Sequence, residues 1–185
     1  MTKLILDPGK SNVRLRTFAE GLFSRLAHDL ELVCRDASGA AERAGDGKGS
    51  VTLLFPVERI DVHGTLKDGR VDPDGLSPSD RADCLAKMRK DVFHVDGAPS
   101  STIRVEATLE AGKARVRVAP PRGRTVERAV TVRVEPADGA GARVSGAFEL
   151  SLNELGAAPV KGPMNAFRVK DTIEILFDLV FGASG

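Results

Sequence analysis

The chain has no tryptophan and no tyrosine, and its eight phenylalanines are the only aromatic residues. Proteins that bind single-stranded nucleic acid stack bases on aromatic side chains, and membrane-spanning proteins place Trp and Tyr at the two membrane interfaces. The aromatic content is 4% and the formal net charge is +1. The sequence therefore predicts neither a nucleic-acid partner nor a membrane-spanning role.

Cysteine and histidine are also scarce. Cys34 and Cys84 are the only cysteines, and their isolated positions indicate two reduced, packed thiols rather than a disulfide framework. The three histidines, His28, His63 and His94, lie far apart and show no HxH or HExxH spacing. There is no GxSxG motif either. The sequence therefore predicts no metal site, no catalytic residues and no enzyme of the nucleophilic classes.

Long apolar runs are missing as well. No stretch approaches the roughly 18–20 apolar residues of a membrane-spanning helix. The N-terminal sequence MTKLILDPGKSNV lacks the apolar stretch and the cleavage site of a secretory signal, which predicts a cytoplasmic protein. At 185 residues, with 42% hydrophobic and 29% charged residues, the chain is expected to form one globular domain over 1–185.

What the sequence has in abundance is alternation of apolar and polar residues. The clearest example lies at 171–181, where one face of an extended strand would carry Ile173, Ile175, Phe177, Leu179 and Phe181. Including this segment, alternation predicts eight strands, near 11–16, 28–35, 51–56, 102–109, 113–119, 126–135, 143–152 and 168–181. Such a period of two is typical of antiparallel strands with one buried face.

The length of the last strand suggests how the sheet is completed. Residues 171–181 would span about 36 Å at roughly 3.3 Å per residue, and a strand of that length needs partners on both edges. A closed barrel in which this strand pairs with 11–16 satisfies both edges. An eight-stranded barrel has an interior that side chains fill or that holds one small ligand. A two-sheet sandwich is the alternative that alternation does not exclude.

Three segments depart from the strand pattern. The sequence SPSD at 77–80 combines an N-cap serine, a proline at the first helical position and a capping-box acid, which predicts a helix near 78–91. Apolar residues with helical spacing predict a short helix near 18–26. The Gly-rich segment 36–50 is expected to be a loop or a hairpin tip.

Five stretches of the chain resemble a known family through their order and spacing. They are LILDPGKSNVRLRTFAEG, DRADCLAKMRKDVFHVDGAPSSTIRVEATLE, GRTVERAVTVRVE, VSGAFELSLNELGAAPV and VKDTIEILFDLVF. The chain resembles, over almost its whole length, the YceI-like family of lipid- or polyisoprenoid-binding proteins. The segment GLFSRLAHDLEL is a variant of the family's early region, and the cavity has no Tyr or Trp for head-group contacts.

The resemblance implies an all-β fold, an extended eight-stranded antiparallel β-barrel of lipocalin-like shape with an elongated apolar cavity. Its members are associated with isoprenoid quinones, polyprenyl chains or other amphiphiles, and many are periplasmic or secreted. For this chain it implies non-catalytic binding and carriage of an isoprenoid-like amphiphilic lipid. A bound lipid or quinone is then the only cofactor-like molecule expected. Whether the protein forms a homodimer is left open.

If the barrel holds a cavity, inward-facing apolar residues of several strands are candidates to line it. They are Val13, Leu15, Leu30, Leu32, Val105, Phe148, Leu150, Ile175, Phe177 and Leu179. Aliphatic and Phe walls suit a prenyl chain, because burial of hydrocarbon is non-directional and contributes about 0.8 kcal/mol per CH₂. The alternative is that these residues fill a dry core in a ligand-free stress-related or protein-interaction module.

Three polar residues are candidates to contact a head group. His28 shares its strand parity with Leu30 and Leu32, so its imidazole is expected to face the barrel interior, where it would contact a head group or a quinone carbonyl. The alternatives are a histidine bonded to backbone at a strand end, or an enzyme using His28 with a second titratable group. Arg122 and Arg124 lie in a predicted turn, where they would reach a phosphate or pyrophosphate at the barrel mouth.

Overall fold

The computed structural model describes residues 1–21, 28–44, 48–95, 101–162 and 167–183. Its strands are β1 (Thr2–Leu6), β2 (Asn12–Thr17), β3 (Ala19–Glu20), β4 (Asp29–Cys34), β5 (Ser38–Arg43), β6 (Gly49–Pro56), β7 (Ile60–Lys67), β8 (Arg70–Asp72), β9 (Thr102–Glu110), β10 (Lys113–Ala119), β11 (Val126–Pro136), β12 (Ala142–Ser151), β13 (Arg168–Val169) and β14 (Thr172–Ala183). The helix α1 (Pro78–Lys87) continues as a π-helical turn, Met88–Val92, and a short 3-10 turn, Val57–Arg59, joins β6 to β7. The fold is therefore almost entirely β, as expected.

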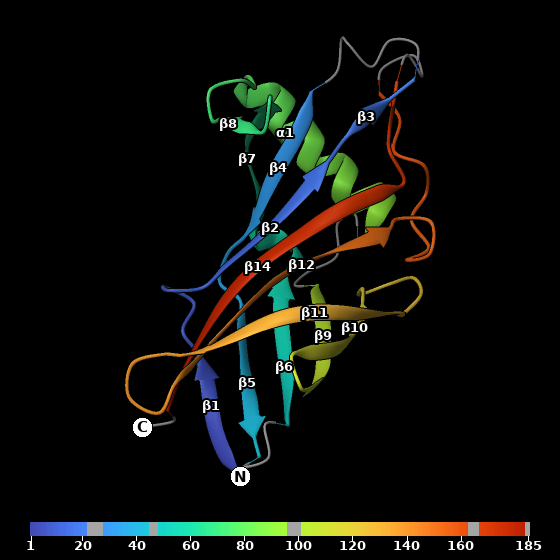
Figure 1. Ribbon diagram of the computed structural model, residues 1–185. Coiled ribbons are helices and arrows are strands. Elements are labelled where there is room, and N and C mark those ends of the chain that lie inside the picture. Colours follow the sequence, from blue (N-terminus) through green and yellow to red (C-terminus); the bar gives the residue numbers. More distant parts are fainter. Residues whose placement is uncertain (22–27, 45–47, 96–100, 163–166, 184–185) are drawn as a thin grey trace.

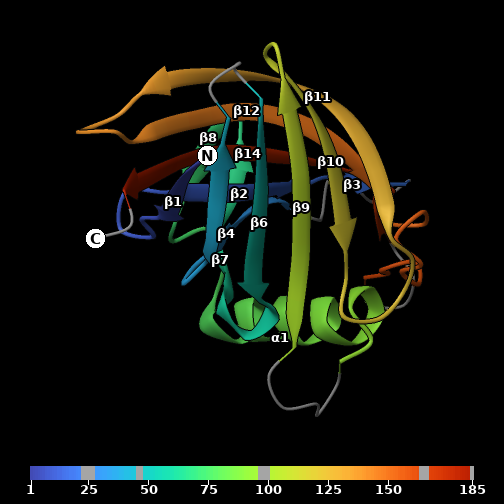
Figure 2. The same cartoon turned by 90° about the horizontal axis from the view of Figure 1, so that it is seen from below.

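Eight strands form a closed antiparallel barrel in the order β1-β5-β6-β9-β10-β11-β12-β14, and the pairing of β1 with β14 completes the circle (Figures 1 and 2). The barrel prediction is confirmed, and the sandwich alternative is wrong. The predicted closing pair needs one correction. Residues 11–16 do pair with β14, but the barrel is closed by β1, where Leu6 lies opposite Phe181.

Beside the barrel, the sheet continues as an open extension in the order β2-β4-β7-β8, which we call the open sheet. It grows from the first half of β14, where β2 pairs between Glu174 and Asp178. β1 and β2 follow each other along the same edge of β14. On their other edge, β1 pairs with β5 and β2 pairs with β4. Long, interrupted strands therefore belong to the barrel at one end and to the open sheet at the other.

The helix begins as the sequence predicts. Ser77 is the N-cap, and its hydroxyl oxygen accepts a hydrogen bond from the Asp80 N–H at 3.1 Å, with proline at the first helical position. Arg81 anchors the helix to the open sheet, because its guanidinium donates to the Val62 carbonyl and, at 2.8 Å, to the Pro73 carbonyl. Figure 2 shows α1 crossing below the ends of β6 and β9. The helix therefore lies over one end of the barrel.

Two local predictions need correction. Residues 22–26 of the helix expected near 18–26 lie outside the described residues, and Ala19–Glu20 form strand β3, which pairs with β13. The segment 36–50 is not a simple loop, because it contains β5 and the start of β6. β5 is rich in small residues, yet it pairs with β1 on one side and β6 on the other. Backbone hydrogen bonds from both neighbours hold it in the wall without large side chains.

Candidate functional site

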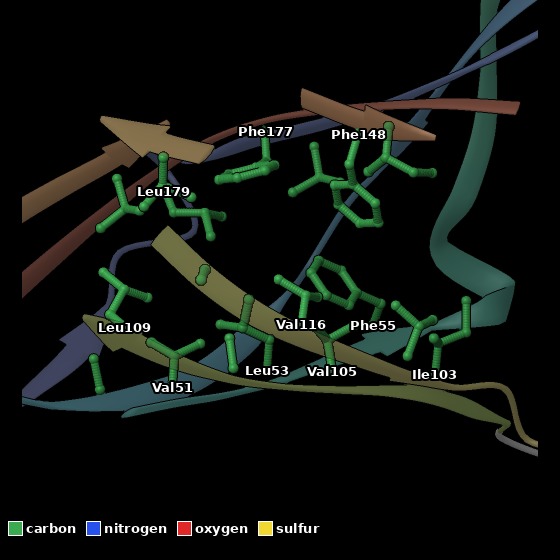
Figure 3. Close-up of a pocket in the computed structure, with 18 of the residues that line it drawn as sticks. Val51, Leu53, Phe55, Ile103, Val105, Leu109, Val116, Phe148, Phe177 and Leu179 are labelled. Atoms are coloured by element: carbon green, nitrogen blue, oxygen red, sulfur yellow. The ribbon is translucent and has the colours of Figure 1, made fainter. Parts of the chain in front are cut away.

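The barrel encloses a cavity of about 520 Å³. Every barrel strand contributes inward-facing side chains to its wall, most of them Val, Leu, Ile, Phe or Ala. In Figure 3, Phe148 and Phe177 point from one side of the barrel across the cavity toward Val105 and Val116. The two rings meet edge to face, with centroids 6.2 Å apart. The wall is therefore aliphatic and aromatic, with no tyrosine hydroxyl or indole N–H to orient a ligand.

The two ends of the cavity differ in chemistry. Val92 and Phe93, at the end of the π-helical turn, help to form an apolar floor together with Leu152 and Leu155. Around the opposite end, which we call the mouth, the lining is polar and comes from the β5–β6 hairpin. The charged and hydroxyl side chains there are those of Glu42, Arg43, Lys48 and Ser50. The cavity is thus closed by apolar groups at one end and rimmed by charges at the other.

The structure brings together most of the apolar residues singled out in the sequence. Val13, Leu15, Val105, Phe148, Leu150, Ile175, Phe177 and Leu179 all line the cavity. Leu30 and Leu32 do not, because their part of β4 belongs to the open sheet, where Leu32 is buried in the packed core. Strand parity indicates which face of a sheet a residue occupies, but not whether that face encloses a cavity.

His28 lies elsewhere than expected. It precedes β4, its side chain is exposed, and it is not among the residues that line the cavity. The expectation that its imidazole faces the barrel interior is therefore wrong, for the same reason as for Leu30. Because His28 does not line the cavity, the hypothesis of an enzyme that uses His28 in the pocket is not supported.

Arg122 and Arg124 also lie away from the mouth. They belong to the connection between β10 and β11, beside the floor, where the Arg124 N–H donates to the Leu155 carbonyl at 2.8 Å. The Arg124 guanidinium donates to the Asn153 carbonyl at 2.6 Å. The expectation that this pair lies at the barrel mouth is therefore wrong, because a turn's sequence does not indicate which end of a barrel it occupies.

The cations at the mouth were not predicted. Arg43 is the last residue of β5 and Lys48 directly precedes β6, and Lys48 forms an ion pair with Glu110 at 3.3 Å. They lie in the small, Gly-rich segment that carries no alternation of large apolar residues. Charged side chains in a polar segment usually only contact solvent. Nothing in the sequence therefore indicated that Arg43 and Lys48 lie at the rim of a cavity.

A buried ionic cluster lies on the outer face of the open sheet. The Glu31 side chain is 0% exposed; it accepts hydrogen bonds from Arg16 Nε at 2.9 Å and from His63 Nδ1 at 3.0 Å, and Arg14 lies 3.8 Å away. Burial alone would raise the pKa of Glu31. The hydrogen bonds from His63 and Arg16 and the nearby guanidinium charges outweigh it and hold that pKa below its ordinary value. This cluster joins β2, β4 and β7 and does not face the cavity.

The thiols and the acidic clusters of the described residues give no sign of nucleophilic catalysis or metal binding. Cys34 and Cys84 are free thiols, and burial raises the pKa of Cys34, at the cavity wall, to about 12. A thiol with so high a pKa is a poor nucleophile at neutral pH. Among the described residues, no group of three or more His, Cys, Asp or Glu side chains could hold a metal ion. No helix in the described part of the chain is long and apolar enough to cross a membrane.

Comparison with known proteins identifies the fold. No family model and no curated protein sequence matches the chain. Its structure resembles the crystal structure of BcnA from Burkholderia cenocepacia with a TM-score of 0.59 and 18% sequence identity, covering 95% of this chain and 98% of the BcnA chain. The likeness therefore extends over both whole chains. At this level of identity it shows a common fold: a closed antiparallel barrel accompanied by one helix.

Proposed function

We propose that this protein belongs to the YceI-like barrels and that it binds and carries an amphiphilic lipid, without catalysis. The apolar part of the ligand, an isoprenoid-like chain of a polyprenyl lipid or an isoprenoid quinone, occupies the barrel cavity. The observation that carries the proposal is the cavity itself, about 520 Å³ in volume with a wall of Val, Leu, Ile, Phe and Ala. The resemblance of the sequence to the family and the likeness of the fold to BcnA support it.

The volume and chemistry of the cavity argue for an apolar ligand. Ligand pockets commonly measure roughly 300–1,000 Å³. Filled with water, this cavity would hold about 17 molecules at roughly 30 Å³ each. Water in such a place would lose hydrogen bonds, because the polar side chains of the lining are confined to the mouth. A hydrocarbon chain loses nothing there and gains about 0.8 kcal/mol for each CH₂ removed from water.

The apolar interior of the cavity and the polar groups outside it fit a molecule that has an apolar chain and a polar head. Between the rim at Arg43 and Ser50 and the floor at Phe93, the interior is lined by apolar side chains. A packed, ligand-free module is the weaker alternative, because a protein interior normally leaves few voids larger than a water molecule. An enzyme is weaker still, because no histidine is among the described residues that line the cavity, and the charged side chains of that lining lie at the mouth.

Native mass spectrometry tests the proposal directly. The purified protein is measured as isolated and after incubation with polyprenyl alcohols of increasing length, with saturated fatty acids as the comparison. We expect a one-to-one adduct whose abundance rises with prenyl chain length until the cavity is filled. If no prenyl compound binds and organic extraction of the purified protein yields no lipid, the proposed function is wrong.

A pair of matched variants locates the binding site. Ala107 lies in the middle of β9 and lines the cavity, whereas Ala129 lies exposed on β11. Ala107→Phe places a ring in the cavity and should weaken binding of a polyprenyl alcohol at least tenfold. Ala129→Phe adds the same ring outside the barrel and should leave affinity unchanged within twofold. Equal losses in both variants would show that the chain does not bind in the cavity.

A further inference from the structure

The barrel wall is interrupted at one place, beside the continuous strand β14. β1 pairs with β14 as far as Leu6 opposite Phe181, and β2 begins with Asn12 opposite Asp178. Residues 7–11 of the first chain segment therefore lie beside only residues 179–180 of β14. The surplus residues leave the wall as a turn, which Figure 1 shows as the dark-blue connection that projects beyond β1 and β2.

The neighbouring strand is interrupted at the same height. Cys34, the last residue of β4, pairs with Val13, and pairing resumes in β5 where Ala40 lies opposite Ile5. Between them the chain turns at Asp36, whose φ of 54° lies in the left-handed region and breaks the extended conformation. The first segment stays attached to β14, because the Asp7 N–H donates to the Val180 carbonyl at 2.8 Å. However, no backbone hydrogen bond between described residues joins residues 7–11 to residues 35–39, so the wall is open between these two segments.

A second hollow of about 320 Å³ lies at this opening, which we call the window. Its outer part is formed by exposed residues of the two interrupted segments, including Gly9, Asn12 and Arg35. Its inner part consists of Val13, Cys34 and Leu179, and the same three side chains line the main cavity. A single layer of side chains therefore separates the window from the cavity.

The carboxylates in and beside the window already have partners. The Asp7 carboxylate already accepts from the N–H groups of Gly9 and Lys10, at 3.0 and 3.3 Å, and Asp36 forms an ion pair with Arg59. Within the described part of the chain, the side chains of Arg35 and Asn12 have no hydrogen bond or ion pair. The guanidinium and the amide are therefore available to bind oxygen atoms of a ligand.

We propose that the window binds the polar head group of the ligand, and that this head group is rich in hydrogen-bond acceptors, such as a quinone carbonyl or a diphosphate. This inference rests on the proposed function, because the apolar chain occupies the main cavity. The chain passes between the side chains of Val13, Cys34 and Leu179, and the head group lies against Arg35 and Asn12. With about 320 Å³, the window has room for about ten water molecules at roughly 30 Å³ each, which is enough for such a group.

Calorimetric titration of the full-length protein with three probes tests the assignment. The probes are farnesyl diphosphate, a benzoquinone with a short prenyl chain, and a prenyl hydrocarbon without a head group. Arg35→Ala should weaken binding of the first two about tenfold, the effect of losing one charge-assisted hydrogen bond. It should leave hydrocarbon binding unchanged within twofold. Arg115→Ala, on the exposed outer face of β10, is the control and should change none of the three.

Two further variants separate the alternatives. Arg43→Ala removes a cation from the mouth, and a larger loss there than in Arg35→Ala would place the head group at the mouth and overturn the inference. Arg35→Glu distinguishes the two head groups, because a negative charge should repel the diphosphate far more strongly than the neutral quinone. If the hydrocarbon binds but Arg35→Ala has no effect on any probe, the window assignment fails and the proposed function stands. If no probe binds to the unmodified protein, both fail.

Discussion

The barrel and the open sheet are built from the same interrupted strands, yet one encloses a cavity and the other is packed. In the open sheet, Leu32 and Val62 are buried, and α1 packs against β7. In the barrel, small inward residues such as Ala107 and Ala114 leave space that no other element enters. Alternation of apolar and polar residues therefore produces either a core or a cavity. What decides is whether another part of the chain covers the inner face.

A second difference concerns the outer faces. The described ion pairs on the barrel exterior, such as Arg115 with Glu127, join exposed side chains. On the open sheet, Glu31 is covered completely by the cations around it. Exposed pairs contribute little to stability, whereas a buried carboxylate depends strongly on its partners. Among the described residues, the open sheet thus combines a buried ionic cluster on its outer face with apolar packing on its inner face.

The largest expected effect comes from shortening one leucine in each region. Leu32→Ala should destabilise the protein by about 4 kcal/mol, because the packed open sheet has no way to fill the new void. Leu109→Ala should cost only about 2 kcal/mol, because Leu109 faces the cavity, is only partly buried and therefore loses fewer contacts. Urea unfolding followed by circular dichroism measures both. Equal losses would show that the cavity is collapsed in solution.

The ionic cluster gives the next effect. Glu31→Ala should lower the free energy of unfolding by about 3 kcal/mol, because two guanidinium groups then lose their common partner. This figure is at the lower end of the range for buried pairs, since Arg14 and His63 retain contact with water. Glu149→Ala, at an exposed position on β12, is the matched control and should have a small effect in the same unfolding experiment. A similar loss in both variants would contradict the importance of the cluster.

Adding atoms should show the same order of sensitivity, with the larger loss in the open sheet. A Cβ at Gly75 would lie 2.1 Å from Oγ1 of the buried Thr65 in the open sheet, so Gly75→Ala should cost about 2 kcal/mol. Ala107→Leu adds more atoms but places them in the cavity, so we expect a change of less than about 1 kcal/mol. Thermal unfolding of the two variants tests this, and a larger loss for Ala107→Leu would be inconsistent with an open cavity.

The smallest effect is a change in the acid dependence of stability. Although burial opposes ionisation, the partners of Glu31 hold its pKa below the ordinary value of 4.5. The stabilisation is therefore complete above about pH 4.5, and it is lost as the pH falls through the lowered folded-state pKa. Glu31→Gln removes this titration. Below pH 4.5 its free energy of unfolding should decline less steeply with falling pH than that of the unmodified protein, as measured by urea titrations across that range.

Alternation of apolar and polar residues predicted those strands that have one buried apolar face and one polar face. The five inward residues predicted for the last strand, 171–181, all line the cavity. The helix beginning at Ser77 was also predictable, because its cap depends only on neighbouring residues. Closure through β1 was less visible, since Thr2–Leu6 is short and its role depends on a partner at the far end of the chain.

The site was harder to predict because its position depends on three-dimensional closure. β5 escaped prediction, since its stability comes from two flanking strands rather than from its own side chains. Arg122 lies in a polar connection and Arg43 at the end of the polar strand β5. Only the direction of the strands around the barrel places Arg122 near the floor and Arg43 at the mouth. The window is a further case, because it arises from two interruptions that are adjacent in space but distant in sequence.

The floor of the cavity lies outside the barrel strands, and part of it belongs to the end of a helix. Val92 and Phe93 reach it through the π-helical turn that follows α1, and Phe93 donates its N–H to the Met88 carbonyl at 3.2 Å. Val92 and Phe93 thus limit how far a ligand can extend into the cavity, and they belong to a segment separate from the barrel strands. Replacing one residue there would lengthen or shorten the accessible tunnel while every strand kept its register. Selection for ligand length and selection for a stable barrel can therefore act on different residues of this chain.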